Sequence, residues 1–141
     1  MEGTAMEKMN RAEYLEKFID NTFTKTFLSD LFSTAFYGSS WFCVSYSDVN
    51  DKALIKDVKS KNNCREDIWA DLLLRGGKIA VSDIEDDEET HVLTLDDIKN
   101  GFVIVMAKYP GMFNAIVEET GDLYDADAVI QCAIFGEIVY G

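Results

Sequence analysis

The sequence is short of proline, histidine and cysteine: it has one proline, one histidine and three cysteines in 141 residues. A single proline argues against a proline-rich linker, and the length suits one domain with its own core. With one histidine and no serine or cysteine motif around it, a histidine-based triad is excluded, and we expect no enzyme. The odd cysteine count without C-x-x-C spacing favours reduced thiols over a disulfide scaffold.

Long apolar runs are also missing, since no stretch reaches the ~18 residues that span a bilayer. The N-terminal residues are polar and lack the apolar segment of a signal peptide. We therefore expect a flexible leader over 1–9, a single domain over 10–141 and a soluble, cytoplasmic protein. Hydrophobic residues make up 48% of the chain and aromatic residues 12%, which suits a packed globule.

Basic residues are scarce in the second part of the chain, and the formal net charge is −13. Residues 1–82 hold 12 acids and 11 bases, whereas residues 83–141 hold 14 acids and only Lys99 and Lys108. Carboxylates repel phosphates, so we expect no direct binding of nucleic acid and no binding to an anionic membrane. The charge favours cationic partners instead.

The first half of the chain reads as helices around one strand. Apolar residues at helical spacing predict helices over 10–20 and 26–37, the second ended by Gly38. Trp41 to Tyr46 is aromatic and β-branched, with large side chains on both faces, which predicts a central strand. A further helix is predicted over 64–74, ended by Gly76-Gly77. Residues 52–61 carry four lysines, and the pattern assigns them no element.

The second half predicts a hairpin followed by helices. Strands over 78–84 and 91–93 would pair across Glu85 to Thr90. Thr94 and Asp97 would cap a helix over 95–108, although its apolar middle, 102–107, is also compatible with a strand. Pro110-Gly111 breaks it, and helices over 112–119 and 125–139 follow. Strands and helices do not alternate, so we predict an α+β fold: an antiparallel sheet of about three strands packed with four to six helices.

The most pronounced feature is a run of six acids in seven positions, with two more at the next helix start. These residues are Asp83, Glu85, Asp86, Asp87, Glu88, Glu89, Asp96 and Asp97. One interpretation is a solvated loop followed by acids at a helix N-terminus, where the helix dipole favours them. The other is a mimic of a phosphate backbone, because an extended chain and one DNA strand both repeat about every ~3.4 Å. On that interpretation the eight residues bind a partner.

Metal binding is the competing chemistry for the acid run. Asp83, Glu85, Asp87 and Glu89 alternate, and calcium prefers oxygen ligands. The run has no glycine and no bidentate glutamate at the expected spacing, so we expect no metal site and no cofactor. A second acidic set, Asp122, Asp125 and Asp127, is explained more simply by capping of the last helix.

The remaining single features have ordinary structural interpretations. Cys43, Cys64 and Cys132 lie in apolar segments and are predicted to be small core residues. His91 is predicted to lie on the surface of the hairpin. Residues 126–141 are strongly apolar, which predicts core packing but also leaves open a dimer seam and hence a homodimer.

Several segments of the second half resemble short accessory proteins of bacterial phages and conjugative elements. They are Trp69-x-x-Leu72 with Gly76-Gly77-Lys78-Ile79, the stretch from Leu93 to Gly101, and the stretches Asp125 to Gln131 and Phe135 to Ile138. The resemblance covers roughly residues 65–141 and transfers no site residues. It implies a setting in which small acidic proteins inhibit host defence, anti-CRISPR and anti-restriction proteins among them.

These observations leave two function classes. The first is a non-enzymatic inhibitor from a mobile element, whose acidic surface binds a basic groove of a nucleic-acid-handling protein such as a CRISPR nuclease, acting as a DNA mimic. The alternative is a structural or oligomeric interaction module, in which the acids only maintain solubility. An enzyme or small-ligand binder would need a pocket with perturbed carboxylates. Whether the lysines of 52–65 neutralise the acid run decides how strong the first hypothesis is.

Overall fold

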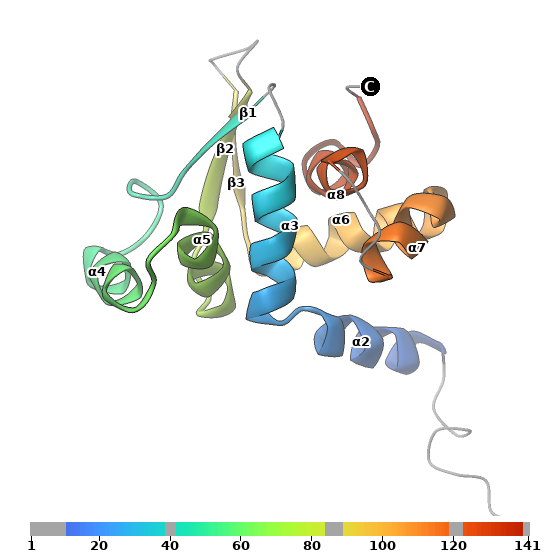
Figure 1. Cartoon of the computed structure of the whole chain (residues 1–141), viewed down its shortest axis with the longest axis horizontal. Helices are drawn as coiled ribbons and strands as arrows, with labels where there is room; N and C mark the ends of the chain where they lie inside the picture. Colours follow the sequence, from blue (N-terminus) through green and yellow to red (C-terminus); the bar gives the residue numbers. More distant parts are fainter. Residues whose placement is uncertain (1–10, 39–41, 84–88, 119–122, 140–141) are drawn as a thin grey trace, which may run out of the picture.

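The computed structural model describes residues 11–38, 42–83, 89–118 and 123–139. Within them, seven helices and a three-stranded antiparallel sheet form an α+β fold, as predicted (Figure 1). The helices are α2 (Arg11–Thr22), α3 (Lys25–Gly38), α4 (Lys52–Lys61), α5 (Arg65–Leu74), α6 (Leu95–Lys108), α7 (Pro110–Val117) and α8 (Leu123–Phe135). The strands are β1 (Phe42–Ser45), β2 (Ile79–Asp83) and β3 (Thr90–Leu93). None of the described helices is both long and apolar enough to cross a membrane.

The strand order is β1-β2-β3. The prediction that the segment from Trp41 to Tyr46 forms the central strand is therefore wrong, because β2 is central and β1 forms an edge of the described sheet. β1 pairs antiparallel with β2, from Phe42 opposite Asp83 to Ser45 opposite Ala80. The predicted hairpin of β2 and β3 is confirmed. Large side chains on both faces of a short strand do not require a neighbour on both edges, because a helix can bury one face while the other stays open.

One face of the sheet enters the main core, and the other is mostly small or exposed. Phe42, Ile79, Val81 and Leu93 point to the buried face. There α3 and α5 cover the sheet (Figure 1), and an aromatic cluster of Phe32, Phe36, Phe42 and Trp69 fills the space between them. Successive side chains of a strand point to opposite faces, so the alternation of apolar residues determines which face of the sheet is buried.

The closest helix packing is between α6 and α8. A β-carbon on Gly101 of α6 would lie 2.4 Å from the carbonyl oxygen of Val129 and 2.8 Å from the amide nitrogen of Ala133. Only a glycine lets the two backbones approach this closely. The crossing buries Phe102, Val105, Val129 and Ile130 completely. Residues 102–107, for which the sequence is compatible with a helix or a strand, belong to helix α6.

The end of α5 has the geometry that Gly76-Gly77 predicts. Gly76 adopts a φ of 86°, and the amide of Gly77 donates to the carbonyl of Leu72 at 2.7 Å while that of Gly76 donates to Leu73 at 3.1 Å. This pair of bonds is a Schellman cap. The side chain of Asn50 then joins the preceding turn to the start of β2, because it bonds both the amide and the carbonyl of Lys78 at 2.8 Å.

Helix α4 was not predicted, and it explains why the structure has one helix more than the expected upper number. Its apolar face is narrow: only Val58 is fully buried, next to the partly buried Leu54 and Ile55. It packs on α5 through a second small cluster of Val58, Ile68 and Leu72. A helix that relies on one neighbour needs few apolar positions, so its sequence looks more like a polar loop.

Three helix boundaries also differ from the prediction. Pro110 follows the end of α6 but also begins α7 at its first helical position, where proline is favoured. α8 ends at Phe135 rather than 139, because Gly136 adopts a φ of 77° and its amide closes the last turn on Cys132. The predicted start at Asn10 lies outside the described residues, and Gly38 is the last residue of α3 rather than the stop beyond it.

Two predictions for single residues need correction. Only Cys132 of the three thiols is a core residue; Cys64 is half-buried and Cys43 is exposed on the open face of the sheet. An apolar sequence segment does not reveal on which face of a strand its cysteine lies. His91 is not a surface residue, since its ring packs edge-on against Phe135 and its side chain is 27% exposed. It points to the same sheet face as Val44 and Val81.

Candidate functional site

The acid run lies at the turn of the β2–β3 hairpin, and its middle, residues 84–88, lies outside the described residues. Asp83 is the last residue of β2, and Glu89 is exposed just before β3 begins. The register pairs Ser82 with Thr90, whose hydroxyls are 3.1 Å apart. Glu85, Asp86, Asp87 and Glu88 therefore belong to the connection at this end of the sheet, which we call the hairpin end.

Asp96 and Asp97 do not join this group. They follow the far end of β3, where Leu93 pairs with Ile79, about 14 Å along the strand from the hairpin end. Asp97 forms the predicted capping box: its carboxylate accepts from the amide and the hydroxyl of Thr94 at 2.8 and 3.1 Å. Asp96 is exposed. Sequence proximity suggested one surface, but an extended strand separates the two groups.

The lysines of α4 also lie at the opposite end of the sheet from the hairpin. β1 starts beside Asp83 and runs away from it, and α4 follows after the turn at 46–51 (Figure 1). Lys52, Lys56 and Lys59 share one helix face at i, i+4 and i+7, and all three are exposed. Among the described side chains, none of the three lysines forms an ion pair with Glu89.

Two bases, Lys61 at the end of α4 and Arg75 just after α5, are neutralised locally. Arg75 forms ion pairs with Asp57 and, at 3.1 Å, with Asp71, while Lys61 lies 3.0 Å from Asp57. The Arg75 and Lys61 side chains lower the pKa of Asp57, and both carboxylates raise the pKa of Arg75. We call this set the α4–α5 network. It pairs the acids and bases of this region with each other, not with the hairpin.

The network continues to α3 through Asn62, the only buried polar residue besides Gln131 among the described residues. Its amide donates to the carbonyl of Val58 and the carboxylate of Asp71, both at 2.9 Å, and its oxygen accepts from Lys25 at 2.5 Å. Every polar atom of the Asn62 side chain is therefore used. Asn62 positions the α4–α5 turn against the first turn of α3.

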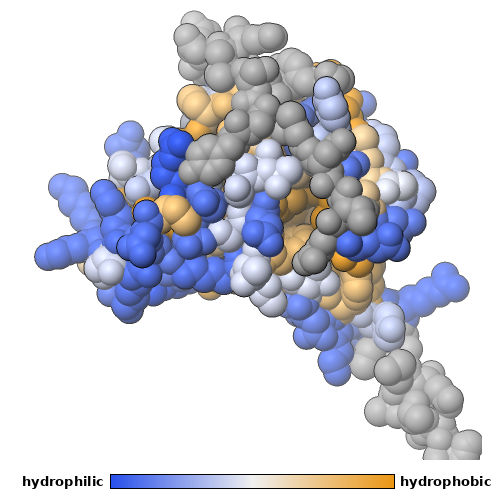
Figure 2. All heavy atoms as spheres, viewed as in Figure 1, coloured by the Kyte–Doolittle hydropathy of each residue, from blue (hydrophilic) through white to orange (hydrophobic). Residues whose placement is uncertain are grey.

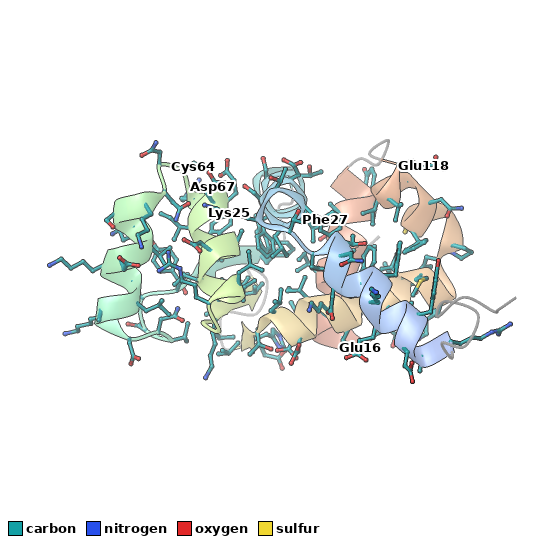
Figure 3. The ribbon with its side chains drawn as sticks, turned by 90° about the horizontal axis from the view of Figure 1, so that it is seen from below. Glu16, Lys25, Phe27, Cys64, Asp67 and Glu118 are labelled. Atoms are coloured by element: carbon teal, nitrogen blue, oxygen red, sulfur yellow. The ribbon has the colours of Figure 1, made fainter. Side chains whose placement is uncertain are left out.

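A second polar contact between α3 and α5 involves a cysteine. Ser29 donates to the carboxylate of Asp67, and this bond, the Cys64 thiol and the charge of Lys25 lower the pKa of Asp67. Figure 3 shows Cys64, Asp67 and Lys25 at the same end of α5 and α3. The backbone amide of Asp67 lowers the pKa of Cys64, but partial burial and the carboxylates of Asp67 and Glu66 outweigh it and raise the pKa overall. The thiol stays protonated and is a poor nucleophile.

At the hairpin end, His91 lies next to Glu89, the one member of the acid run whose side chain is described. Its Nε2 lies 3.6 Å from a carboxylate oxygen of Glu89. Nε2 is buried and has no hydrogen-bond partner in the described part of the chain. The imidazole supplies at most one positive charge to a run of six acids, so it does not neutralise the run.

Oxygen clusters that could hold a metal do not occur among the described residues. The alternating set considered for calcium has only its flanking members, Asp83 and Glu89, within them. Of the second acidic set, Asp122 lies outside the described residues, and Asp125 and Asp127 belong to the first turns of α8. Asp127 accepts from the buried Gln131 at 2.8 Å, whose oxygen accepts from the amide of Val139 at 2.7 Å. This chain of bonds holds residues 136–139 against α8.

The described residues form a groove of about 500 Å³ between α3, α7, α8 and the α2–α3 connection. Figure 2 shows it as a hollow with a hydrophobic lining. Phe27, Leu31, Ile116 and Ala126 form its apolar part. Its polar part consists of side chains with oxygen atoms, and the described lining residues include no lysine, arginine or histidine. The polar residues are Asn21, Thr22, Thr24, Thr26, Asp30 and Thr34. No sequence pattern singles out this groove, although the stripe Thr26, Asp30 and Thr34 has helical spacing.

Of the apolar terminal segment, predicted as core or dimer seam, α8 is a core element, whereas Val139 beyond it is exposed. Val129, Ile130 and Cys132 of α8 are almost fully buried within this chain.

Comparison with known proteins adds no assignment: no protein-family model matches the chain, and no curated protein or solved structure is detectably similar to it.

Proposed function

We propose that this protein is a non-enzymatic inhibitor that binds a basic groove of a nucleic-acid-handling protein through the acid run at the hairpin end. The target class is a host defence nuclease of the CRISPR effector type, and the acid run acts as a nucleic-acid mimic. This follows the anti-CRISPR-like resemblance of residues 65–141, and we place the protein in the cytoplasm, where its three thiols stay reduced.

One observation carries the proposal: the exposed lysine face of α4 is separated in space from the strand ends that the acid run connects. The lysines of α4 lie beyond the other end of a sheet whose central strand has five residues, or roughly 14 Å. That distance exceeds the ~8 Å Debye length at physiological salt, so the two charge groups act independently. A run of acids that repel one another gains most when a cationic surface approaches.

Because Asp96 and Asp97 lie away from the hairpin end, the proposed binding surface is smaller than the eight acidic residues of the sequence prediction. Asp97 is engaged in the capping box of α6, and both residues lie beyond the far end of β3. The proposal therefore assigns the main contact to Asp83 and residues 85–89, while Asp96 and Asp97 serve α6 first.

The test is charge reversal of Glu85, Asp86, Asp87 and Glu88 to lysine. Wild type and variant are used as baits in host lysate at low and physiological salt, and captured nucleases are then assayed for inhibition. The expected result is that the variant loses both capture and inhibition, and that wild-type binding weakens steeply with salt.

The matched control reverses four exposed acids elsewhere, so that the net charge changes equally: Glu16, Asp48, Asp51 and Glu118. This control should retain the partner. Retention of capture and inhibition by the hairpin variant would contradict the proposal. Equal loss in both variants would show that net charge matters and the hairpin does not.

A further inference from the structure

The groove between α3, α7 and α8 has a lining of unusual composition for a surface hollow. Thr26, Asp30 and Thr34 lie one helical turn apart on α3 and are all exposed. Within the part of the chain that the structure describes, these three side chains form no hydrogen bond or ion pair. Their oxygen atoms stand beside the apolar surface of Phe27 and Leu31.

The other two threonines of the lining are already engaged. Thr22 donates to the carbonyl of Phe18 at 2.8 Å, and Thr24 accepts from the amide of Phe27 at 3.2 Å, where it caps α3. They line the groove and form hydrogen bonds with backbone groups near the α2–α3 connection. The free oxygen atoms of the groove are thus concentrated on the α3 stripe.

Charge defines the ligand class. Among the described lining residues, Asp30 carries the only formal charge, so the groove disfavours anions, and its acceptor oxygens favour a donor-rich cation. Phe27 is half-buried and offers the exposed part of its ring, because the rest packs edge-on against Phe23 and Phe102. A guanidinium presents five donors in a plane and stacks on aromatic rings, whereas an ammonium does neither.

We propose that this groove binds an arginine side chain of the basic partner. The guanidinium bonds to Asp30 and to the hydroxyl of one of the two flanking threonines, because Thr26 and Thr34 lie about 12 Å apart along α3. Its methylene stem lies on Phe27, Leu31 and Ile116. The cavity volume is within the ~300–1,000 Å³ of pockets that enclose small ligands. The inference rests on the proposed function, since it takes the arginine from the protein that the acid run attracts.

A single arginine is the probe that separates the groove from the acid run. Nα-acetyl-arginine amide is titrated to about 50 mM into isotope-labelled protein, and the amide resonances are followed by NMR. The expected result is a saturable shift at Thr26, Phe27, Leu31 and Thr34. The lysine analogue should bind at least about threefold more weakly, because it lacks the planar donor fork.

Two variants with the same charge change make the test specific. Asp30→Lys should weaken arginine binding by about fivefold or more. Asp48→Lys, at an exposed position on the turn before α4, should leave it unchanged. Both side chains are exposed, so both variants are expected to fold, and the dispersion of the spectrum checks this.

The outcomes separate this inference from the proposed function. Shifts confined to Glu89–Val92, no shift at all, or equal binding by Asp30→Lys would overturn the groove assignment, and the hairpin proposal would stand. If instead the hairpin charge reversal leaves partner capture intact while the groove still binds arginine, the proposed function fails and the groove site is retained.

Discussion

The molecule joins two regions that are stabilised differently. In the α6–α8 region the backbones touch at Gly101 and the interface is apolar. In the α4–α5 region a narrow apolar cluster is supplemented by the α4–α5 network and by Asn62. Close apolar packing yields most of the free energy of folding, whereas polar contacts yield little net energy and are costly to leave half-made. The two regions should therefore respond to mutation by different mechanisms.

The largest effect is expected at the α6–α8 crossing. Gly101→Ala places a β-carbon within 2.4 Å of a backbone carbonyl that cannot move aside without shifting α8. Overpacking of this kind costs about 2–3 kcal/mol, or roughly 10 °C in melting temperature for a chain of this size. Thermal and urea unfolding measure it.

Gly111 supplies the matched control for that variant. A β-carbon there meets nothing within 4 Å, so Gly111→Ala should be neutral or stabilise α7 by about 0.5–1 kcal/mol through helix propensity alone. Similar unfolding free energies for the two variants would refute the close crossing.

The second largest effect is expected from Asn62→Ala in the α4–α5 region. It removes the bond that Lys25 donates and one of the two bonds that Asp71 accepts, the other coming from Arg75, and should cost about 2 kcal/mol. Hydrogen exchange should show that protection falls in α4 and α5 more than in α6 and α8, since α4 packs mainly on α5. Asn63→Ala, at the exposed neighbouring position, should change neither quantity; a comparable loss there would show that the helix turn, not the network, is affected.

A smaller effect is expected at the start of α6. Thr94→Ala removes the hydroxyl of the capping box and should cost about 1 kcal/mol, read as a lower urea midpoint. Thr94→Ser keeps the hydroxyl and should restore most of the loss. Failure of serine to restore stability would assign the effect to the threonine methyl group instead.

The smallest effect is a dependence on pH in the α3–α5 contact. Because the pKa of Asp67 in the folded protein lies below its ordinary value of 3.8, the ionised carboxylate stabilises the fold above that pH. The contribution is lost as pH falls through 3.8 towards the folded pKa. Ser29→Ala removes the strongest cause of the shift, so its stability should approach that of wild type below pH 4. Ser45→Ala, an exposed serine, should parallel wild type at every pH.

Much of this fold follows from local patterns. The hairpin of β2 and β3, the capping box of α6 and the glycine cap of α5 all depend on residues a few positions apart, so the sequence predicts them well. Helix α4 was missed because its stability depends on a neighbour, Leu72 of α5, and not on its own pattern. The edge position of β1 was missed because strand order is a long-range property.

The candidate site was only half predictable for the same reason. The acid run is visible in the sequence, and so is its lack of bases nearby in the chain. The groove is not visible, because Thr26 and Asp30 on α3 come together with Ile116 and Ala126 only when α7 and α8 pack against α3.

The sequence by itself determined the charge asymmetry, the α+β class and the position of the acid run in a turn, since composition and short-range hydrogen bonding need no tertiary contacts. Only the tertiary structure decided which charges meet. It placed the lysines of α4 beyond the far end of the sheet, engaged Asp97 in a helix cap, and paired Arg75 with Asp57 and Asp71. Electrostatic interactions depend on distance in space, which the antiparallel strands and the α5–β2 connection set.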